Sequence, residues 1–347
     1  MTTDVLVVGG GPVGLAAAVE ARLAGLSVVV VEPREGEIDK ACGEGLMPGA
    51  LDAVHRLGVD PAGHPLLGVS YRSGRRHADH LFSAGPGRGV RRTTLHAALR
   101  ERAAALGVEH VTERVTAVEE TADTVAAAGV EARWLLACDG LHSSVRRIVG
   151  LDVPTPPSAL PWRRDADRRR FGLRRHFRVR PWNDLIEVHW GDGVEAYVTP
   201  VADDVVGVAL LGPPRNDFAA SLAGFHEISE HLRGAEPLGA VRGAGPLRQA
   251  SRRRTAGRVR LVGDASGYVD ALTGEGLRVG LAQARAAVAC LEDPAGYERA
   301  WSAATRDYRL LTSGLVAWAQ SPARRGIVPV AGAAPGLYGW VVDRLAR

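Results

Sequence analysis

Residues 5–25 read VLVVGGGPVGLAAAVEARLAG and decide the fold, because they join a short apolar strand to a helix through a glycine-rich turn. The turn has the spacing Gly-x-Gly-x-x-Gly at Gly9, Gly11 and Gly14, which in this strand–turn–helix setting is a dinucleotide-binding signature. Gly9 permits the tight turn, Gly11 lets the backbone approach a pyrophosphate, and Gly14 lets the helix pack against the strand. The N–H groups at the start of the helix then face the phosphates. The sequence therefore predicts a Rossmann-like dinucleotide site.

The next apolar segment, LSVVVVE at residues 26–32, predicts a second strand that ends in Glu32. An acidic side chain at this position accepts hydrogen bonds from the adenosine ribose hydroxyls and repels a 2′-phosphate. We therefore expect FAD or NAD, and not NADP, as the tightly held dinucleotide. Arg34, two residues further on, is included among the expected cofactor contacts.

Two segments in the middle of the chain resemble parts of the flavoprotein hydroxylases. Residues 134–150, WLLACDGLHSSVRRIVG, are similar to the second FAD fingerprint of that family, in which a strand delivers Asp139-Gly140 to the pyrophosphate. Residues 90–108, VRRTTLHAALRERAAALGV, are similar to the family helix that opens with an arginine, here Arg92, and continues with leucines three and seven residues later. The resemblance implies that Arg92, Asp139 and Gly140 contact FAD.

A third segment, residues 258–288, reads RVRLVGDASGYVDALTGEGLRVGLAQARAAV and resembles the family's third FAD fingerprint. There a strand ends in Gly263-Asp264, and the resemblance implies that Asp264 hydrogen-bonds the ribityl hydroxyls. The TGEG loop that follows is expected to pass the edge of the flavin ring, with the next helix aimed at the ring. The contacts implied in this loop are Gly274, Glu275 and Gly276.

The order and spacing of these segments match the FAD-dependent hydroxylase superfamily, built like 4-hydroxybenzoate hydroxylase, over most of residues 1–290. The resemblance implies an α/β fold: a Rossmann-like FAD-binding domain, an inserted antiparallel-sheet substrate domain and C-terminal helices. A Pro-rich stretch at residues 153–162 marks a crossing between the two domains. The expected division is FAD-binding domain at 1–70, 90–152 and 251–292, substrate domain at 71–89 and 153–250, and a helical region at 293–347.

Within the superfamily, the motif details are closest to the geranylgeranyl reductases and to natural-product tailoring enzymes. Residues 39–59, DKACGEGLMPGALDAVHRLGV, and the TGEG loop both resemble the reductase branch. The reductases' Tyr-x-Trp-x-Phe-Pro signature is only partly present, because EAYVTP keeps Tyr197 and Pro200 but has valine and threonine between them and no second aromatic residue. Lys40, the single lysine of the chain, is not in a halogenase setting, and the halogenases' Trp-x-Trp-x-Ile-Pro segment is absent. Halogenation is therefore the least favoured activity.

Composition excludes several other classes of protein. The chain has 347 residues, with 46% hydrophobic and 24% charged residues, which is ordinary for a globular protein. The 43 basic and 39 acidic residues give a net charge of only +4, and no nucleic-acid motif is present. No apolar run is long enough for a membrane helix. Three widely spaced cysteines and a first strand close to Met1 favour a cytoplasmic protein with reduced thiols.

Cys42 and Tyr197 are the candidate catalytic residues. Cys42 lies in the loop that covers the flavin in the resembling reductases, where it would tune the flavin or donate a proton; a small buried residue is the simpler interpretation. Glu44 is expected to cap the helix that follows it, within residues 45–58. Tyr197 lies on the predicted substrate sheet, as do His189 and Trp190, which alternate to opposite faces. No metal site is expected.

The sequence thus predicts an FAD-dependent monooxygenase that uses NAD(P)H as a transient electron donor and O2 to oxygenate a small hydrophobic natural-product intermediate. An FAD-dependent reductase of isoprenoid-type or other double bonds is the first alternative. A flavin-binding subunit without catalytic activity is the second. The identity of the substrate, the choice of NADH or NADPH and the oligomeric state stay open, because the register of the substrate sheet shapes the pocket.

Overall fold

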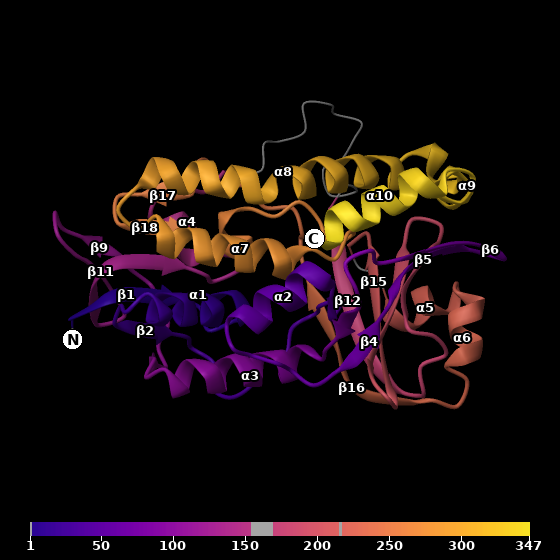
Figure 1. The fold of residues 1–347 in the computed structure, drawn as a ribbon, viewed down its shortest axis with the longest axis horizontal. Coiled ribbons are helices and arrows are strands. Elements are labelled where there is room, and N and C mark those ends of the chain that lie inside the picture. Colours follow the sequence, from indigo (N-terminus) through magenta and orange to yellow (C-terminus); the bar gives the residue numbers. More distant parts are fainter. Residues whose placement is uncertain (1, 154–168, 215–216) are drawn as a thin grey trace.

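Two sheets lie side by side in this protein, and a layer of helices runs across both of them (Figure 1). The structure is a computed structural model that describes residues 2–153, 169–214 and 217–347. Most of the Pro-rich stretch at residues 153–162 lies outside these ranges. The fold is the expected α/β architecture, with a dinucleotide-type sheet, an antiparallel sheet and C-terminal helices.

The first sheet has five parallel strands in the order β18-β11-β1-β2-β8, with short antiparallel strands added at its edges. Val5–Val8 and Val28–Val31 are buried throughout, as expected for parallel strands covered on both faces. The strands are β1 (Thr2–Val8), β2 (Val28–Val31), β8 (Glu109–Val111), β9 (Glu119–Glu120), β10 (Val125–Ala127), β11 (Val130–Ala137), β17 (Thr255–Ala256) and β18 (Val259–Leu261).

Helices cover one face of this sheet and form its largest apolar core. The first of them begins directly after the glycine turn, with Gly11 as its N-cap and a proline at its first position, where the missing N–H costs nothing. A long helix, α8, packs on α7 and extends over the second sheet (Figure 1). These helices are α1 (Pro12–Leu23), α2 (Pro48–Arg56), α3 (Arg92–Ala105), α7 (Gly276–Ala289) and α8 (Pro294–Ala319), with the short α4 (Ser144–Ile148) near the opposite face.

The second sheet has seven strands in the order β16-β12-β15-β14-β13-β5-β6, all antiparallel except the β13–β5 pair. One face packs on α5 (Phe218–Ala223) and α6 (His226–His231), and the other faces the first sheet and the C-terminal helices. Its strands are β5 (Gly68–Ser73), β6 (Arg76–Leu81), β12 (Phe171–Arg178), β13 (Leu185–Trp190), β14 (Glu195–Ala202), β15 (Val205–Gly212) and β16 (Glu236–Ala244). A small sheet of β3 (Gly45–Leu46), β7 (Gly87–Gly89) and β4 (His64–Leu66) connects the two halves.

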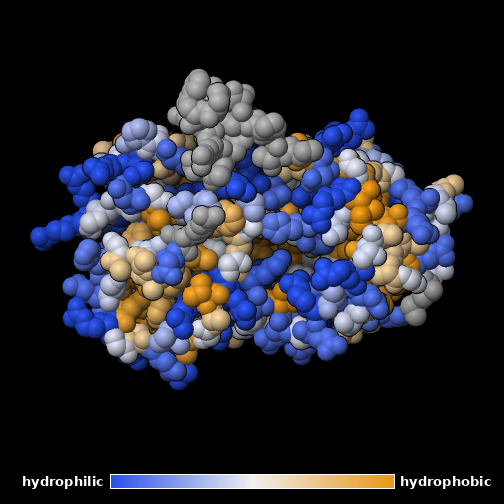
Figure 2. Space-filling model, turned by 180° about the vertical axis from the view of Figure 1, so that it is seen from behind, coloured by the Kyte–Doolittle hydropathy of each residue, from blue (hydrophilic) through white to orange (hydrophobic). Residues whose placement is uncertain are grey.

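The C-terminal segment folds back onto the second sheet. It consists of the 3-10 turn η3 (Pro322–Gly326), α9 (Ile327–Ala333) and α10 (Pro335–Ala346). The helix α9 packs on β5 and β6, and α10 packs on β6. The hydroxyl of Tyr338 donates to the carbonyl of Val69 at 3.1 Å. Among the described residues, no helix has the length and apolar content needed to cross a membrane. The face in Figure 2 is mainly hydrophilic, with its apolar side chains in separate patches.

Candidate functional site

A cavity of about 830 Å³ lies between the carboxyl ends of the parallel strands and the inner face of the second sheet. This volume is within the range of cofactor and ligand sites. One half is lined by the glycine turn and by charged side chains, and the other half by apolar side chains of the second sheet. The sheet residues of the apolar half are Val69, Ile186, Val188 and Leu211, and Leu247, which follows β16, lies with them.

The glycine turn can be built only from glycines at its ends. Gly9 has a φ of +107°, and a Cβ on it would lie 2.5 Å from the carbonyl oxygen of Cys138. A Cβ on Gly14 would lie 1.8 Å from the carbonyl oxygen of Gly9. Gly11 instead lines the cavity, and only the Arg92 guanidinium lies within 4 Å of the position of a Cβ there. The turn therefore leaves backbone N–H groups open to the cavity.

Glu32 directly follows β2 at the wall of the cavity and is hydrogen-bonded to both neighbouring segments. Its carboxylate accepts from the Gly10 amide at 2.9 Å and from Arg34 Nε at 2.7 Å. Burial acts to raise the pKa of Glu32, but the hydrogen bonds from Arg34 and Gly10 outweigh it and hold the pKa below its usual value. Glu32 is therefore an ionised acceptor with its position fixed. Arg34 also lines the cavity, with its guanidinium turned toward Glu32.

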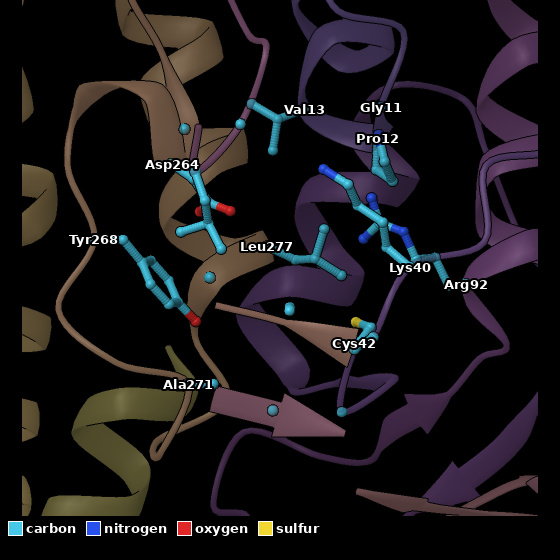
Figure 3. A pocket seen from close by; sticks show the side chains of 18 of the residues that line it. Gly11, Pro12, Val13, Lys40, Cys42, Arg92, Asp264, Tyr268, Ala271 and Leu277 are labelled. Carbon is cyan, nitrogen blue, oxygen red and sulfur yellow. The ribbon is translucent and has the colours of Figure 1, made fainter. Parts of the chain in front are cut away.

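Lys40 and Arg92 point into the cavity from one side and Asp264 from the other (Figure 3). Burial lowers the pKa of Lys40, and the nearby Arg92 and Arg34 lower it further. Burial raises the pKa of Asp264, although Lys40 and Arg92 act to lower it. Among the described residues, the Asp264 carboxylate has no hydrogen-bond donor, and Arg92 Nε is buried without an acceptor. Opposite charges that face one space without bonding each other fit a phosphate-bearing polar chain between them.

Asp139 and Gly140 line the cavity at the end of β11. One Asp139 carboxylate oxygen caps α4 by accepting from the amides of Ser144 at 2.7 Å and Val145 at 3.1 Å. The other oxygen is buried and has no partner among the described residues. Gly140 has a φ of +81°, and the Lys40 ammonium lies 3.3 Å from the position of a Cβ on it. Asp139 thus orients a helix while one of its oxygens stays free.

The loop at residues 268–276 is held from both sides. On the α8 side, the Tyr308 hydroxyl bonds the backbone of Val269 and Asp270, and Thr273 bonds Thr312 at 2.7 Å. On the other side, one bond comes from β14 of the second sheet and one from the residue that precedes β12. The Tyr197 hydroxyl donates to the Leu272 carbonyl at 2.7 Å, and Arg170 contacts Asp270 at 2.9 Å.

Arg170, Glu195 and Asp270 form a buried charge cluster that joins the second sheet to this loop. Arg170 bonds Glu195 at 2.7 Å and Asp270 at 2.9 Å. Burial raises the pKa of both carboxyls, and Arg170 opposes that effect. One guanidinium thus holds two carboxylates away from water.

Gly274 and Gly276 line the cavity, but Glu275 between them does not. The Glu275 side chain is buried on the other side of the loop and pairs with Arg278. Its second carboxyl oxygen has no partner among the described residues. The structure therefore places Glu275 behind the loop and not among the groups that face the cavity, because the chain turns its side chain toward α7.

Burial raises the pKa of Glu275 to about 7, and Arg278 opposes that effect. The folded-state pKa lies above the unfolded-state value, so the stability that Glu275 contributes is present at low pH and is lost as the pH rises through about 7. Between about pH 5 and about pH 8, the wild-type protein is expected to lose about 2–3 kcal/mol more unfolding free energy than Glu275→Gln. Urea unfolding of both proteins with FAD present measures this difference. Parallel pH profiles would contradict it.

Glu44 caps a helix, but not the one that follows it. Its carboxylate accepts from the Arg92 amide at 2.8 Å and so caps α3, whereas Met47 starts α2 without a side-chain cap. Its other oxygen accepts from His176 Nε2 at 2.6 Å. Because Arg174 donates to His176 Nδ1 at 3.0 Å, the His176 proton lies on Nε2. The expectation that Glu44 caps the helix within residues 45–58 is thus corrected: Glu44 joins its own loop, which also carries Cys42, to Arg92 and to the second sheet.

The candidate catalytic residues both line the cavity. Cys42 is half-buried, and its sulfur accepts from the Glu44 amide at 3.4 Å. Tyr197 is buried, and burial raises its pKa well above the usual value. Its hydroxyl proton is already given to Leu272. His189 and Trp190 do not line this cavity, and Val198 faces α5 and α6, whereas Thr199 lines the cavity.

Sequence reasoning missed Tyr268. Tyr268 lies on the same side of the cavity as Asp264, and its hydroxyl points into the cavity, with Cys42 on the opposite side (Figure 3). A Cβ on Gly276 would lie 3.3 Å from this hydroxyl. Among the described residues it has no side-chain hydrogen bond, and burial raises its pKa well above the usual value. The position of Tyr268 in the sequence could have identified it, because it lies between Asp264 and the TGEG loop, in a segment expected to pass the flavin.

Comparison with known proteins agrees with this geometry. Residues 2–164 match the family described as FAD binding domain. The chain is 28% identical over 306 residues to digeranylgeranylglycerophospholipid reductase 1 of Methanothermobacter thermautotrophicus, which covers 80% of this chain and 74% of that protein. It is also 28% identical over 334 residues to 12-dehydrotetracycline 5-monooxygenase/anhydrotetracycline 6-monooxygenase of Streptomyces rimosus, with coverages of 82% and 61%. The solved structure of p-nitrophenol 4-monooxygenase from Pseudomonas putida gives a TM-score of 0.78 at 19% identity, over 99% of this chain and 97% of that one.

Proposed function

This chain carries the FAD-binding domain and the fold of the FAD-dependent hydroxylases, and from that premise we propose that it is an FAD-dependent monooxygenase. The substrate is a small hydrophobic natural-product intermediate, NAD(P)H is the electron donor, and O2 supplies the oxygen atom. The observation that carries the proposal is the division of one cavity into a charged half and an apolar half. The charged half suits a dinucleotide, and the apolar half suits a hydrophobic substrate placed against it.

Each half has a defined task. The Gly9–Gly14 turn, Lys40 and Arg92 would hold the phosphates of FAD, with Glu32 on the ribose and Asp264 on the ribityl chain. When bound, FAD supplies the redox chemistry by taking electrons from NAD(P)H and passing them on to oxygen. The apolar side chains of the second sheet orient the substrate and exclude water, which protects reactive species from side reactions.

Tyr197 acts as a positioning residue in this proposal. Its hydroxyl joins β14 to the loop at residues 268–276, so it fixes the distance between the substrate sheet and the flavin-side loop. Glu44 has the same kind of task, because one carboxylate contacts both Arg92 and His176. Both contacts join the half that would hold FAD to the half that would hold substrate.

The oxygen requirement tests the proposal. The protein is reduced with NADH or NADPH under argon and then mixed with hydrophobic polycyclic or quinone-type probes, with and without air. Product is expected only when air is admitted, with NAD(P)H consumed in proportion. Equal product under argon would contradict a monooxygenase.

A reductase of polarised double bonds is the second candidate, and Tyr268 and Cys42 favour it. Both line the cavity near the TGEG loop, and the Tyr268 hydroxyl has no side-chain partner among the described residues. A reductase passes a hydride to the substrate and needs an acid for the accompanying proton. A phenol or a thiol at this place is a donor of the required kind.

The two candidates differ in what Cys42 and Tyr268 do. As a small, half-buried group, Cys42 is expected to tolerate Cys42→Ala with activity within a few-fold, and Tyr268→Phe is expected to behave similarly. A proton donor would lose about 10²-fold or more in turnover. Turnover and FAD content are measured for both variants. A large loss in either variant with FAD still bound would favour the reductase.

A further inference from the structure

A second hollow, of about 470 Å³, lies at the end of the second sheet beyond the apolar half of the cavity. It is bounded by the β5–β6 hairpin, by the turn between β13 and β14, and by η3 with the start of α9. Two pairs of neighbouring arginines line it, one pair from the hairpin and one from η3. They are Arg75, Arg76, Arg324 and Arg325.

The carboxylates of this hollow do not neutralise its arginines. Asp192 and Glu195 both line it. Asp192 is ion-paired with Arg324, and Glu195 is held at 2.7 Å by Arg170 of the buried cluster, which does not line the hollow. Each carboxylate therefore already has a cationic partner. Three arginines are left over.

Two of these three arginines are exposed and have no polar partner among the described residues. The Arg75 and Arg76 side chains make no hydrogen bond or ion pair with any described residue. Arg325 is also exposed and lies near enough to Asp192 to contribute, after Arg324, to lowering the pKa of that carboxyl. The hollow thus presents a surplus of positive charge and several free guanidinium donors. Such forks match the oxygen atoms of a phosphate.

The hollow shares one face of the sheet with the main cavity. On three neighbouring strands, one residue lines the cavity and another residue of the same strand, two positions away, lines the hollow. Since alternate residues of a strand face the same side, each step of two moves about 7 Å along one surface. The pairs are Tyr71 and Ser73, Val188 and Trp190, and Tyr197 and Glu195.

Trp190 lies at the boundary between the two spaces. Its ring meets that of Tyr71 edge to face, with centroids 5.2 Å apart. Its indole Nε1 is buried and has no acceptor among the described residues. A buried donor without a partner is costly, so an acceptor supplied by a ligand would stabilise it. This observation is independent of the arginines.

We propose that this arginine hollow binds the phosphate-bearing end of an amphiphilic substrate whose apolar part lies in the main cavity. The proposal rests on the proposed function and extends it, because the hydrophobic substrate then also carries a phosphate group. The apolar chain follows the shared sheet face past Tyr71 and Trp190. The phosphate oxygens accept from Arg75, Arg76 and Arg325.

Binding of a simple amphiphile to the FAD-loaded protein tests the assignment without turnover. Dodecyl phosphate and dodecanol are titrated below their aggregation limits. The phosphate is expected to bind about tenfold or more tightly than the alcohol, and less tightly as salt is added. The double variant Arg75→Gln/Arg76→Gln is expected to lose that advantage while it binds dodecanol as before. The matched control is Arg233→Gln/Arg299→Gln, which removes the same charge from side chains that are 80% and 74% exposed outside the hollow.

Two results would overturn the proposal. One is equal loss of phosphate binding in both double variants, which would mean that only net charge matters. The other is a raised KM for NADPH in Arg75→Gln/Arg76→Gln with unchanged dodecyl phosphate binding, which would assign the hollow to the electron donor. Because this experiment measures affinity and not turnover, a negative result would overturn the phosphate site without bearing on the oxygen requirement of the reaction.

Discussion

Replacing Gly14 by alanine is expected to cost about 3 kcal/mol of unfolding free energy and to lower FAD retention about tenfold or more. The added Cβ would lie 1.8 Å from the Gly9 carbonyl oxygen and 3.2 Å from Cys138 Cβ. The nearest obstacle is backbone, so no side-chain rotation relieves it. Either α1 moves away from β1 or the turn at Gly9 opens, and both displace the N–H groups that face the cavity.

The control for Gly14→Ala is the same substitution in another helix. Gly314 lies on the exposed face of α8, and a Cβ there has no atom within 4 Å. Gly314→Ala is therefore expected to raise stability by about 0.5–1 kcal/mol, because alanine favours helix more than glycine. Urea unfolding and the flavin released on denaturation are measured for both variants. Normal FAD content in Gly14→Ala would show that the turn does not hold the dinucleotide.

Replacing Arg170 by methionine is expected to destabilise the protein by about 3–5 kcal/mol, because two buried carboxylates lose their shared cation. Burial already raises the pKa of Glu195 and Asp270, and Arg170 opposes that rise. Without Arg170 both pKa values rise further above their unfolded-state values. The loss is then smallest at low pH, where both carboxyls are protonated, and grows as the pH rises through the folded-state pKa values.

Two further variants identify the cause of that loss. Arg170→Met/Glu195→Gln/Asp270→Asn removes all three charges and is expected to recover part of the stability, since burying neutral groups costs less than burying unpaired charges. Arg233→Met removes an exposed arginine and is expected to change stability by less than about 0.5 kcal/mol. Unfolding free energies at several pH values are compared. A triple variant no more stable than Arg170→Met would show that the charges are not the cause.

The elements around the dinucleotide could be predicted because they follow from local rules. The glycine spacing at residues 9–14, the apolar runs of β1 and β2 and the strand-end Glu32 each depend on a few neighbouring residues. The three fingerprint segments then converge on one cavity, since the carboxyl ends of parallel strands lie at the same edge of a sheet.

The side-chain partners around the cavity could not be predicted in the same way. Glu44 caps a helix that begins 48 residues later, and Tyr197 bonds a carbonyl 75 residues away. Such contacts depend on how the two sheets are placed and on strand register, which the sequence pattern leaves free. Glu275 shows the same limit within one loop, because the turn directs its side chain away from the cavity between two glycines that face it.

Isotopic labelling of the product tests most directly the proposal that this protein places oxygen from O2 into a hydrophobic substrate. The FAD-loaded protein is supplied with NADPH or NADH, oxygen gas carrying the heavy isotope, and polycyclic or quinone-type probes. Products are examined by mass spectrometry. One labelled oxygen atom in the product is the predicted result. A product that gains two hydrogen atoms and no label, formed equally well without air, would contradict the claim and identify a reductase.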